Sequence, residues 1–250
     1  MNSILRKLMT ASRLQYFPVK VRAGIAQGAA WTLLPFSSYW RGDQEPEMHN
    51  CIKEIGIRSG STCYDLGAHF GIYSVGLARM VGPTGQVVAF EPNPASFDRL
   101  ERHRRMNRLD WLKTYRAAAS DCCQQSKLLT YGSLNSTTTH LAYEGETISP
   151  ESSPITINSV TLDSLVNSKD IRLPRFVKID VEGHAHKAHA GAASVLKSSR
   201  PTLIVGMHSP QEVEGVLSIL EPLDYRYSVI GNQPSDPNNL IGCDVLFHPR

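Results

Sequence analysis

The sequence contains no long uninterrupted hydrophobic run, and its longest apolar stretch, residues 23–36, includes Gln27. That stretch is too short to span a bilayer. Cysteine is also scarce, with five residues in 250, an odd number without the spacing of a metal site. This usage argues against a disulfide framework and favours reduced thiols in a cytoplasmic compartment. The net charge of +3 is too small to predict nucleic acid as a partner.

Negative charge is missing from the start of the chain, because no acidic residue precedes Asp43. The basic residues of this segment are Arg6, Lys7, Arg13, Lys20, Arg22 and Arg41. Apolar residues among the first ten positions can share one helical face. We expect residues 1–45 to form an N-terminal helical extension that docks on the fold. Peripheral contact with a membrane surface and a transit-type presequence are the alternatives, and no secretory signal is visible.

Two segments predict the first two strands of a nucleotide-binding sheet. The first is YDLGAHFGIYS, residues 64–74, and the second is VVAFEPN, residues 87–93. Each contains an apolar run that ends at a carboxylate, and the first continues through two glycines into a helical pattern. Gly67 and Gly71 are expected where the chain bends sharply and where a ligand lies against bare backbone. The following helix would direct its N-terminal N–H groups toward that ligand.

The turn lacks the G-x-G-x-x-G pattern that binds the pyrophosphate of a dinucleotide, because His69 stands where the second glycine belongs. Asp65, two residues before the first glycine, suits an ammonium group better than a phosphate. Glu91, at the end of the second strand, is placed to accept both hydroxyls of a ribose. A phosphate-free adenosine with an amino-acid tail fits this set. The expected cofactor is therefore S-adenosylmethionine.

The rest of the chain alternates strands with helices, apart from one interruption. A Ser- and Thr-rich segment, residues 126–160, predicts an inserted β-hairpin. Such an insertion forms either a wall of the substrate site or a plain surface hairpin. The two last strands follow each other without a helix, which indicates antiparallel pairing. The predicted strands cover residues 62–66, 86–90, 114–119, 176–179, 202–207, 225–230 and 244–247. The predicted helices cover residues 47–56, 71–80 and 210–220, together with one that begins near residue 94 and another that ends near residue 196.

A second group of ionisable side chains with possible catalytic roles lies in FVKIDVEGHAHKAHAGAASVL, residues 176–196. Asp180 ends a strand there and would face the same crevice as Asp65 and Glu91, since ligands of open α/β sheets bind beyond the carboxyl ends of strands. Asp180, Glu182 and His184 are candidate catalytic residues, with His208 as a further candidate base. We do not expect a metal site, because the neighbouring histidines of this segment do not share one helical face.

The motifs YDLGAHFGIYS, AFEPNP, TLDSL and VKIDVEGHA, in this order and spacing, resemble those of the FkbM-type family of S-adenosylmethionine-dependent class I methyltransferases. Further similarity comes from Glu45-Pro46, Asn135-Ser136, Gly191-Ala192 and Arg200-Pro201. The resemblance implies a Rossmann-like α/β fold over residues 46–250. Its seven-stranded sheet would carry helices on both faces and an antiparallel last strand. The implied reaction is O-methylation of a sugar, glycolipid or natural-product hydroxyl, so the partner is a small-molecule or glycan acceptor.

The resemblance also assigns site residues. Those expected to bind the cofactor are Asp65, Gly67, Ala68, His69, Gly71, Ser74, Glu91, Pro92, Asn93, Ser120, Asp121 and Asp180. Asp121 would lie beside the adenine, and Asp180 and Glu182 would face the methyl group and the acceptor. The chain departs from the family pattern at His69, Ala185, His189 and Gly206. A non-catalytic cofactor-binding protein of the same fold is therefore one alternative, and a nucleotide-linked oxidoreductase is another.

Overall fold

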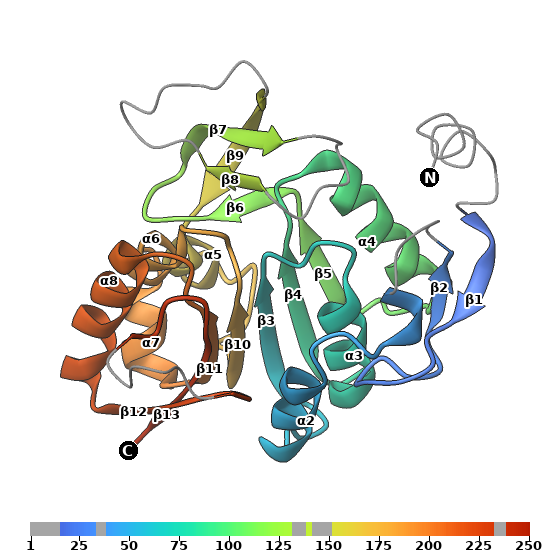
Figure 1. The fold of residues 1–250 in the computed structure, drawn as a ribbon, viewed down its shortest axis with the longest axis horizontal. Coiled ribbons are helices and arrows are strands. Elements are labelled where there is room, and N and C mark those ends of the chain that lie inside the picture. The colour runs from blue at the N-terminus through green and yellow to red at the C-terminus, as the bar shows by residue number, and fades with distance from the viewer. Residues whose placement is uncertain (1–15, 34–38, 132–138, 142–151, 233–238) are drawn as a thin grey trace.

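The computed structural model describes residues 16–33, 39–131, 139–141, 152–232 and 239–250. In this part of the chain, the strands of a seven-stranded sheet are β3 (Thr62–Leu66), β4 (Gln86–Phe90), β5 (Leu112–Tyr115), β10 (Phe176–Ile179), β11 (Thr202–Gly206), β12 (Tyr225–Val229) and β13 (Asp244–Pro249). Their order is β12-β13-β11-β10-β3-β4-β5 (Figure 1). Neighbours are parallel, except that β13 is antiparallel to β11 and β12. The predicted α/β sheet with a reversed last strand is confirmed.

Helices cover both faces of this sheet. One buried cluster includes α2 (Pro46–Glu54), α3 (Ile72–Val81) and α4 (Pro94–Met106), and the other includes α5 (Leu162–Asn167), α6 (Ala185–Ala190), α7 (Ala193–Ser199) and α8 (Pro210–Leu220). Successive side chains of a strand point to opposite faces. In β4, Val87 and Ala89 therefore join the first cluster, while Val88 and Phe90 join the second. The short apolar runs of the sequence are strands buried on both sides.

The predicted bounds of β3, β4, β10 and α8 agree with the structure residue for residue. Helix α4 begins at Pro94 as expected, and the Asn93 side chain caps it by accepting a hydrogen bond from the Ala95 N–H at 3.0 Å. The helix expected through Leu196 is instead split into α6 and α7. Near the break, a Cβ atom at Gly191 would lie 1.8 Å from the Ser120 carbonyl oxygen. In the part of the chain described above, every helix is too short or too polar to cross a membrane.

The helical expectation for the N-terminal segment is wrong over residues 18–32. β1 (Pro18–Lys20) and β2 (Ala30–Thr32) form an antiparallel pair, followed by one 3-10 turn, η2 (Tyr39–Arg41). Gly24 and Gly28 between the strands have φ values of +74° and +80°, which a continuing right-handed helix does not allow. The Trp31 ring is buried and stacks on His103 of α4 with 3.5 Å between ring centroids.

The segment therefore packs by burying its own aromatic side chain against α4. The amphipathic pattern of the first ten residues lies outside the described residues. The division of the chain at residue 45 stays a prediction.

The inserted hairpin is confirmed and is larger than expected. β7 (Gln124–Tyr131) and β9 (Ser152–Val160) pair antiparallel, and they belong to a second sheet of order β6-β9-β7-β8, where β6 is Ala117–Ala119 and β8 is Thr139–Leu141. The third strand expected over residues 114–119 is wrong in one respect. It breaks at Arg116, so that β5 stays beside β4 while β6 pairs with β9. Asn135 and Ser136 lie outside the described residues.

Candidate active site

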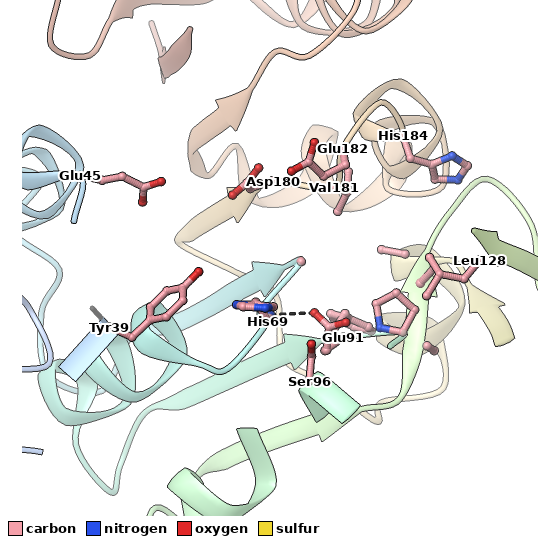
Figure 2. A pocket seen from close by; sticks show the side chains of 16 residues that line it. Tyr39, Glu45, His69, Glu91, Ser96, Leu128, Asp180, Val181, Glu182 and His184 are labelled. Atoms are coloured by element: carbon pink, nitrogen blue, oxygen red, sulfur yellow. Dashed lines mark hydrogen bonds between the residues drawn. The ribbon is translucent and has the colours of Figure 1, made fainter. Parts of the chain in front are cut away.

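A cavity of about 320 Å³ opens beyond the carboxyl ends of β3, β4 and β10 (Figure 2). This is where ligands bind in open α/β sheets. A smaller cavity of about 70 Å³ adjoins it and shares Tyr39, Glu45, Gly67, His69 and Asp180 with it. The larger cavity is lined by Tyr39, Glu45, Gly67, His69, Phe90, Glu91, Pro92, Ser96, Ala117, Ala118, Ala119, Leu128, Asp180, Val181, Glu182 and His184. Half of the predicted site residues therefore line this one cavity, and Ala68 lines the smaller one.

The glycines of the turn after β3 are required by neighbouring protein segments. Gly67 has φ +78°, and a Cβ atom there would lie 1.9 Å from the Asp180 carbonyl oxygen. Gly71 has φ +87°, and its Cβ would lie 2.4 Å from the Leu100 Cδ1 atom. The sharp bend was predicted correctly, but close approach of β10 and α4 is enough to demand both glycines. Gly67 lines the cavity, whereas Gly71 lines neither cavity.

Asp65 lies deeper than predicted. Its side chain is fully buried and lines neither cavity, and the Ser74 hydroxyl donates a hydrogen bond to its Oδ2 atom. Burial raises the pKa of Asp65, against the opposing effect of Lys178, whose Nζ is 3.9 Å from Oδ1. Asp65 and Ser74 are therefore linked to the smaller cavity through Lys178, which lines it, and not by direct contact.

Glu91 lines the cavity at the end of β4, as predicted. Its Oε2 atom accepts a hydrogen bond from the His69 N–H at 2.7 Å, and Oε1 accepts one from the Asn93 N–H at 2.8 Å. Burial raises the pKa of Glu91 to about 7, although these two hydrogen bonds oppose the shift. The carboxylate is thus held rigidly between the turn after β3 and the start of α4 (Figure 2).

A charged network surrounds Asp180. The Lys178 Nζ atom is 3.2 Å from its Oδ2, and the His208 Nε2 atom is 3.0 Å from its Oδ1. Burial acts to raise the pKa of Asp180, but Lys178 and His208 outweigh it and hold the pKa well below its usual range. The hydrogen bond to Asp180 raises the pKa of His208 to about 9. The second ring nitrogen of His208, Nδ1, lies 3.7 Å from Glu182 Oε2. At neutral pH His208 is therefore a cation between two carboxylates.

His184 is not brought together with Asp180 and Glu182. Its ring points away from them (Figure 2), and its Nε2 atom lies 2.9 Å from the Ser120 hydroxyl. Burial lowers the pKa of His184 to about 4, so the ring is neutral at pH 7. Ser120 in turn donates to Asp121 at 2.9 Å, and neither of these two residues lines the cavity. The predicted catalytic trio is thus a pair of carboxylates, with a histidine at the other end of the cavity.

Sequence reasoning missed several residues of the site, among them Lys178, Tyr39 and Glu45. Lys178 is an isolated cation within the apolar strand β10 and is 2% exposed. Tyr39 and Glu45 come from the segment before α2, and the Tyr73 hydroxyl donates a hydrogen bond to Glu45. A lysine inside a short apolar run is a signal that could have been recognised, because a buried ammonium needs a carboxylate partner.

The described residues include no group of three or more His, Cys, Asp or Glu side chains arranged to hold a metal ion. His189 is buried, and its Nδ1 atom faces the Ala185 carbonyl oxygen at 2.8 Å. It therefore has a local structural contact within α6.

A family model described as the methyltransferase FkbM domain matches residues 65–227, most of the chain and nearly all of the residues just described. The chain belongs to the FkbM methyltransferase family. The match begins at Asp65 and includes the two motif segments that carry Glu91 and Asp180. The resemblance inferred from the sequence is confirmed.

One curated protein and two solved structures are similar to this chain. The hexuronic acid methyltransferase AglP of Haloferax volcanii is 29% identical over 166 residues, which cover 62% of this chain and 60% of that protein. Methyltransferase FkbM from Methylobacillus flagellatus has a TM-score of 0.53 at 17% identity, over 78% of this chain and 45% of that one. An S-adenosylmethionine-dependent O-methyltransferase from Thermotoga maritima has a TM-score of 0.50 at 13% identity, over 82% of this chain and 65% of that one. These structures share the fold, and the chain spans about 60% of the length of AglP.

Proposed function

We propose that this FkbM methyltransferase uses S-adenosylmethionine to methylate a hydroxyl group of a sugar, glycolipid or natural-product acceptor. The observation that carries the proposal is Glu91, a buried carboxylate at the end of β4 that lines the cavity. A carboxylate there suits the two hydroxyls of a ribose and repels a pyrophosphate. The hexuronic acid methyltransferase among the relatives supports a sugar as the acceptor class.

The residues present fit this cofactor. Ala117, Ala118 and Leu128 form an apolar end of the cavity that suits an adenine ring. Both ring nitrogens of His69 are buried without a hydrogen-bond partner among the described residues, and burial lowers the pKa of this histidine to about 4. A neutral imidazole in that position can hydrogen-bond to the amino-acid part of the cofactor. We assign the cofactor's ribose to Glu91 and its amino-acid part to the backbone of residues 67–69.

When bound, the cofactor supplies a methyl group already activated by its sulfonium. The protein's task is to align the acceptor hydroxyl, exclude water and accept the proton. Asp180 is the proposed base, because Lys178 and His208 keep it ionised and ready to accept a hydrogen bond from the hydroxyl. Glu182, adjacent in the same cavity, would position the acceptor. In its observed orientation His184 contributes to the wall rather than to proton transfer.

Calorimetry with S-adenosylhomocysteine and, separately, with NAD tests the cofactor assignment. We expect saturable binding of the first and no detectable binding of the second, because the cavity lining offers carboxylates to a ribose and no group for a pyrophosphate. Binding of NAD with higher affinity than S-adenosylhomocysteine would favour the oxidoreductase alternative. Transfer of a labelled methyl group to hydroxyl acceptors then separates an enzyme from a non-catalytic binding protein.

The affinity for S-adenosylhomocysteine should rise with pH through about 7. The folded-state pKa of Glu91 is raised to about 7, so below that pH the free protein holds this carboxyl protonated. Ribose hydroxyls donate to the ionised form, and binding must then release a proton. The dissociation constant should rise by up to about tenfold for each pH unit below 7 and level off above it. In the Glu91→Gln variant this pH dependence should disappear, and its persistence would assign it to another group.

A further inference from the structure

Among the described residues, those that line the larger cavity include several carboxylates and no lysine or arginine. The carboxylates and histidines that line it are Glu45, Glu91, Asp180, Glu182, His69 and His184. The two histidines have pKa values lowered to about 4 by burial, so they are uncharged at pH 7. Figure 2 shows the Glu45 side chain extending from one side toward Asp180, with Glu182 next to Asp180. A ligand in this space therefore faces carboxylates and neutral rings.

The two cations beside Asp180 are already engaged by carboxylates. Lys178 lies between Asp65 at 3.9 Å and Asp180 at 3.2 Å. His208 lies between Asp180 at 3.0 Å and Glu182 at 3.7 Å. Neither cation lines the larger cavity. Each has a carboxylate on either side, so neither is left to bind an anionic group of a substrate.

A further carboxylate adds to this imbalance. Burial, followed by the negative charge of Asp180, raises the pKa of Asp244 to about 6. Its Oδ1 atom would be 3.5 Å from a Cβ atom at Gly206, and Asp180 Oδ1 would be 3.1 Å from the same point. Together with Glu45, the acidic groups around Asp180 outnumber Lys178 and His208. The charge excess is negative even before Glu91 is considered.

We infer that the methyl acceptor is an uncharged sugar, and that the site discriminates against the matching sugar acid. The inference rests on the proposed function and specifies its substrate. A carboxylate brought among Glu45, Asp180 and Glu182 would meet like charges in a partly buried site, where repulsion is stronger than in water. A sugar hydroxyl, in contrast, can donate hydrogen bonds to the same groups. Discrimination by repulsion needs no additional contact to the preferred acceptor.

Matched acceptor pairs test this inference. Each pair would be a p-nitrophenyl hexoside and the hexuronide of the same configuration, in the gluco, galacto and manno series. Binding would be measured by calorimetry in the presence of S-adenosylhomocysteine, and transfer with a labelled methyl donor. We expect at least one hexoside to bind and react about tenfold or more better than its hexuronide. The preference should shrink as salt is raised, because salt screens repulsion at the partly exposed carboxylates.

Two substitutions on or beside α2 separate local charge from total charge. Glu45→Gln removes a carboxylate from the cavity wall and keeps an acceptor for the Tyr73 hydroxyl, so the hexoside preference should fall severalfold. Glu54→Gln removes the same charge from an exposed residue at the end of α2 and should leave the preference unchanged.

Each outcome bears on a different part of the argument. Equal or better binding of the hexuronides would overturn the inference while leaving sugar methylation intact. Binding of S-adenosylhomocysteine without binding or methylation of any pair would overturn the proposed acceptor class and this inference with it. A protein that binds no S-adenosylhomocysteine would refute the proposed cofactor itself.

Discussion

Replacement of Asp180 by Asn is expected to lower turnover by about 10²–10⁴-fold, the usual contribution of a positioned base. The amide cannot take the proton of the acceptor hydroxyl, and it also removes the charge that holds Lys178 and His208 in place. Single-turnover transfer of a labelled methyl group measures the effect on the chemical step. Calorimetry with S-adenosylhomocysteine shows separately whether the cofactor site survives.

The fold should survive this change, because Lys178 keeps Asp65 as a second carboxylate partner. Thermal unfolding checks this point, and Glu182→Gln provides a second variant in the same cavity with a smaller expected loss of turnover. Glu214→Gln, at an exposed position of α8, serves as the control with unchanged turnover. Near-normal rates in the Asp180→Asn variant would remove Asp180 as the base.

Replacement of Glu91 by Ala should weaken cofactor binding by about 10- to 150-fold, or about 1.5–3 kcal/mol, through the loss of a pair of charge-assisted hydrogen bonds to the ribose. The substitution also leaves the His69 and Asn93 N–H groups without their present acceptor. The turn after β3 would then be less rigid, which further lowers the affinity for the cofactor. Calorimetric titration with S-adenosylhomocysteine measures the dissociation constant.

The Glu91→Gln variant separates these two contributions. A glutamine oxygen can accept one of the two backbone hydrogen bonds but carries no charge. The dissociation constant of this variant should therefore lie between those of the wild type and the alanine variant. The exposed Glu214→Gln variant again serves as the unchanged control. An unaltered dissociation constant in the alanine variant would refute the assignment of Glu91 to the ribose.

Some elements could be predicted exactly because their signals are local. β3, β4 and β10 are short apolar runs ending at acidic residues or turns, and α8 begins at a proline after Ser209, which caps it. Strands buried on both faces need continuous apolar sequence, and this makes them visible without tertiary information. The antiparallel pairing of β12 and β13 was predicted because the sequence between them has no helical pattern.

Other elements depended on distant contacts. The segment around Trp31 is a strand whose indole ring stacks on His103 of α4, seventy-two residues later in the chain. The strand expected over residues 114–119 divides because β6 has β9 as a partner outside the main sheet. Local propensity carries no information about such partners, so a helix and a continuous strand were predicted instead.

The candidate site divides in the same way. The order of the chain placed Glu91, Asp180 and Glu182 at strand ends, and parallel strands bring those ends to one edge. The roles of Lys178, His208 and Glu45 arise only from distances across the fold, such as the 3.2 Å between Lys178 and Asp180. His184 was expected beside the carboxylates from its spacing, but its ring lies against Ser120, the residue after β6.

By itself the sequence determined the sheet, the family and the carboxylates that end its strands, because these depend on apolar runs and on residues adjacent in the chain. The tertiary structure alone decided which carboxylates are neutralised, which histidine is charged and which is neutral, and that the cavity wall is left with negative charge. Those properties depend on burial and on distances between residues far apart in sequence, since electrostatic energy in a protein interior is set by what surrounds each charge.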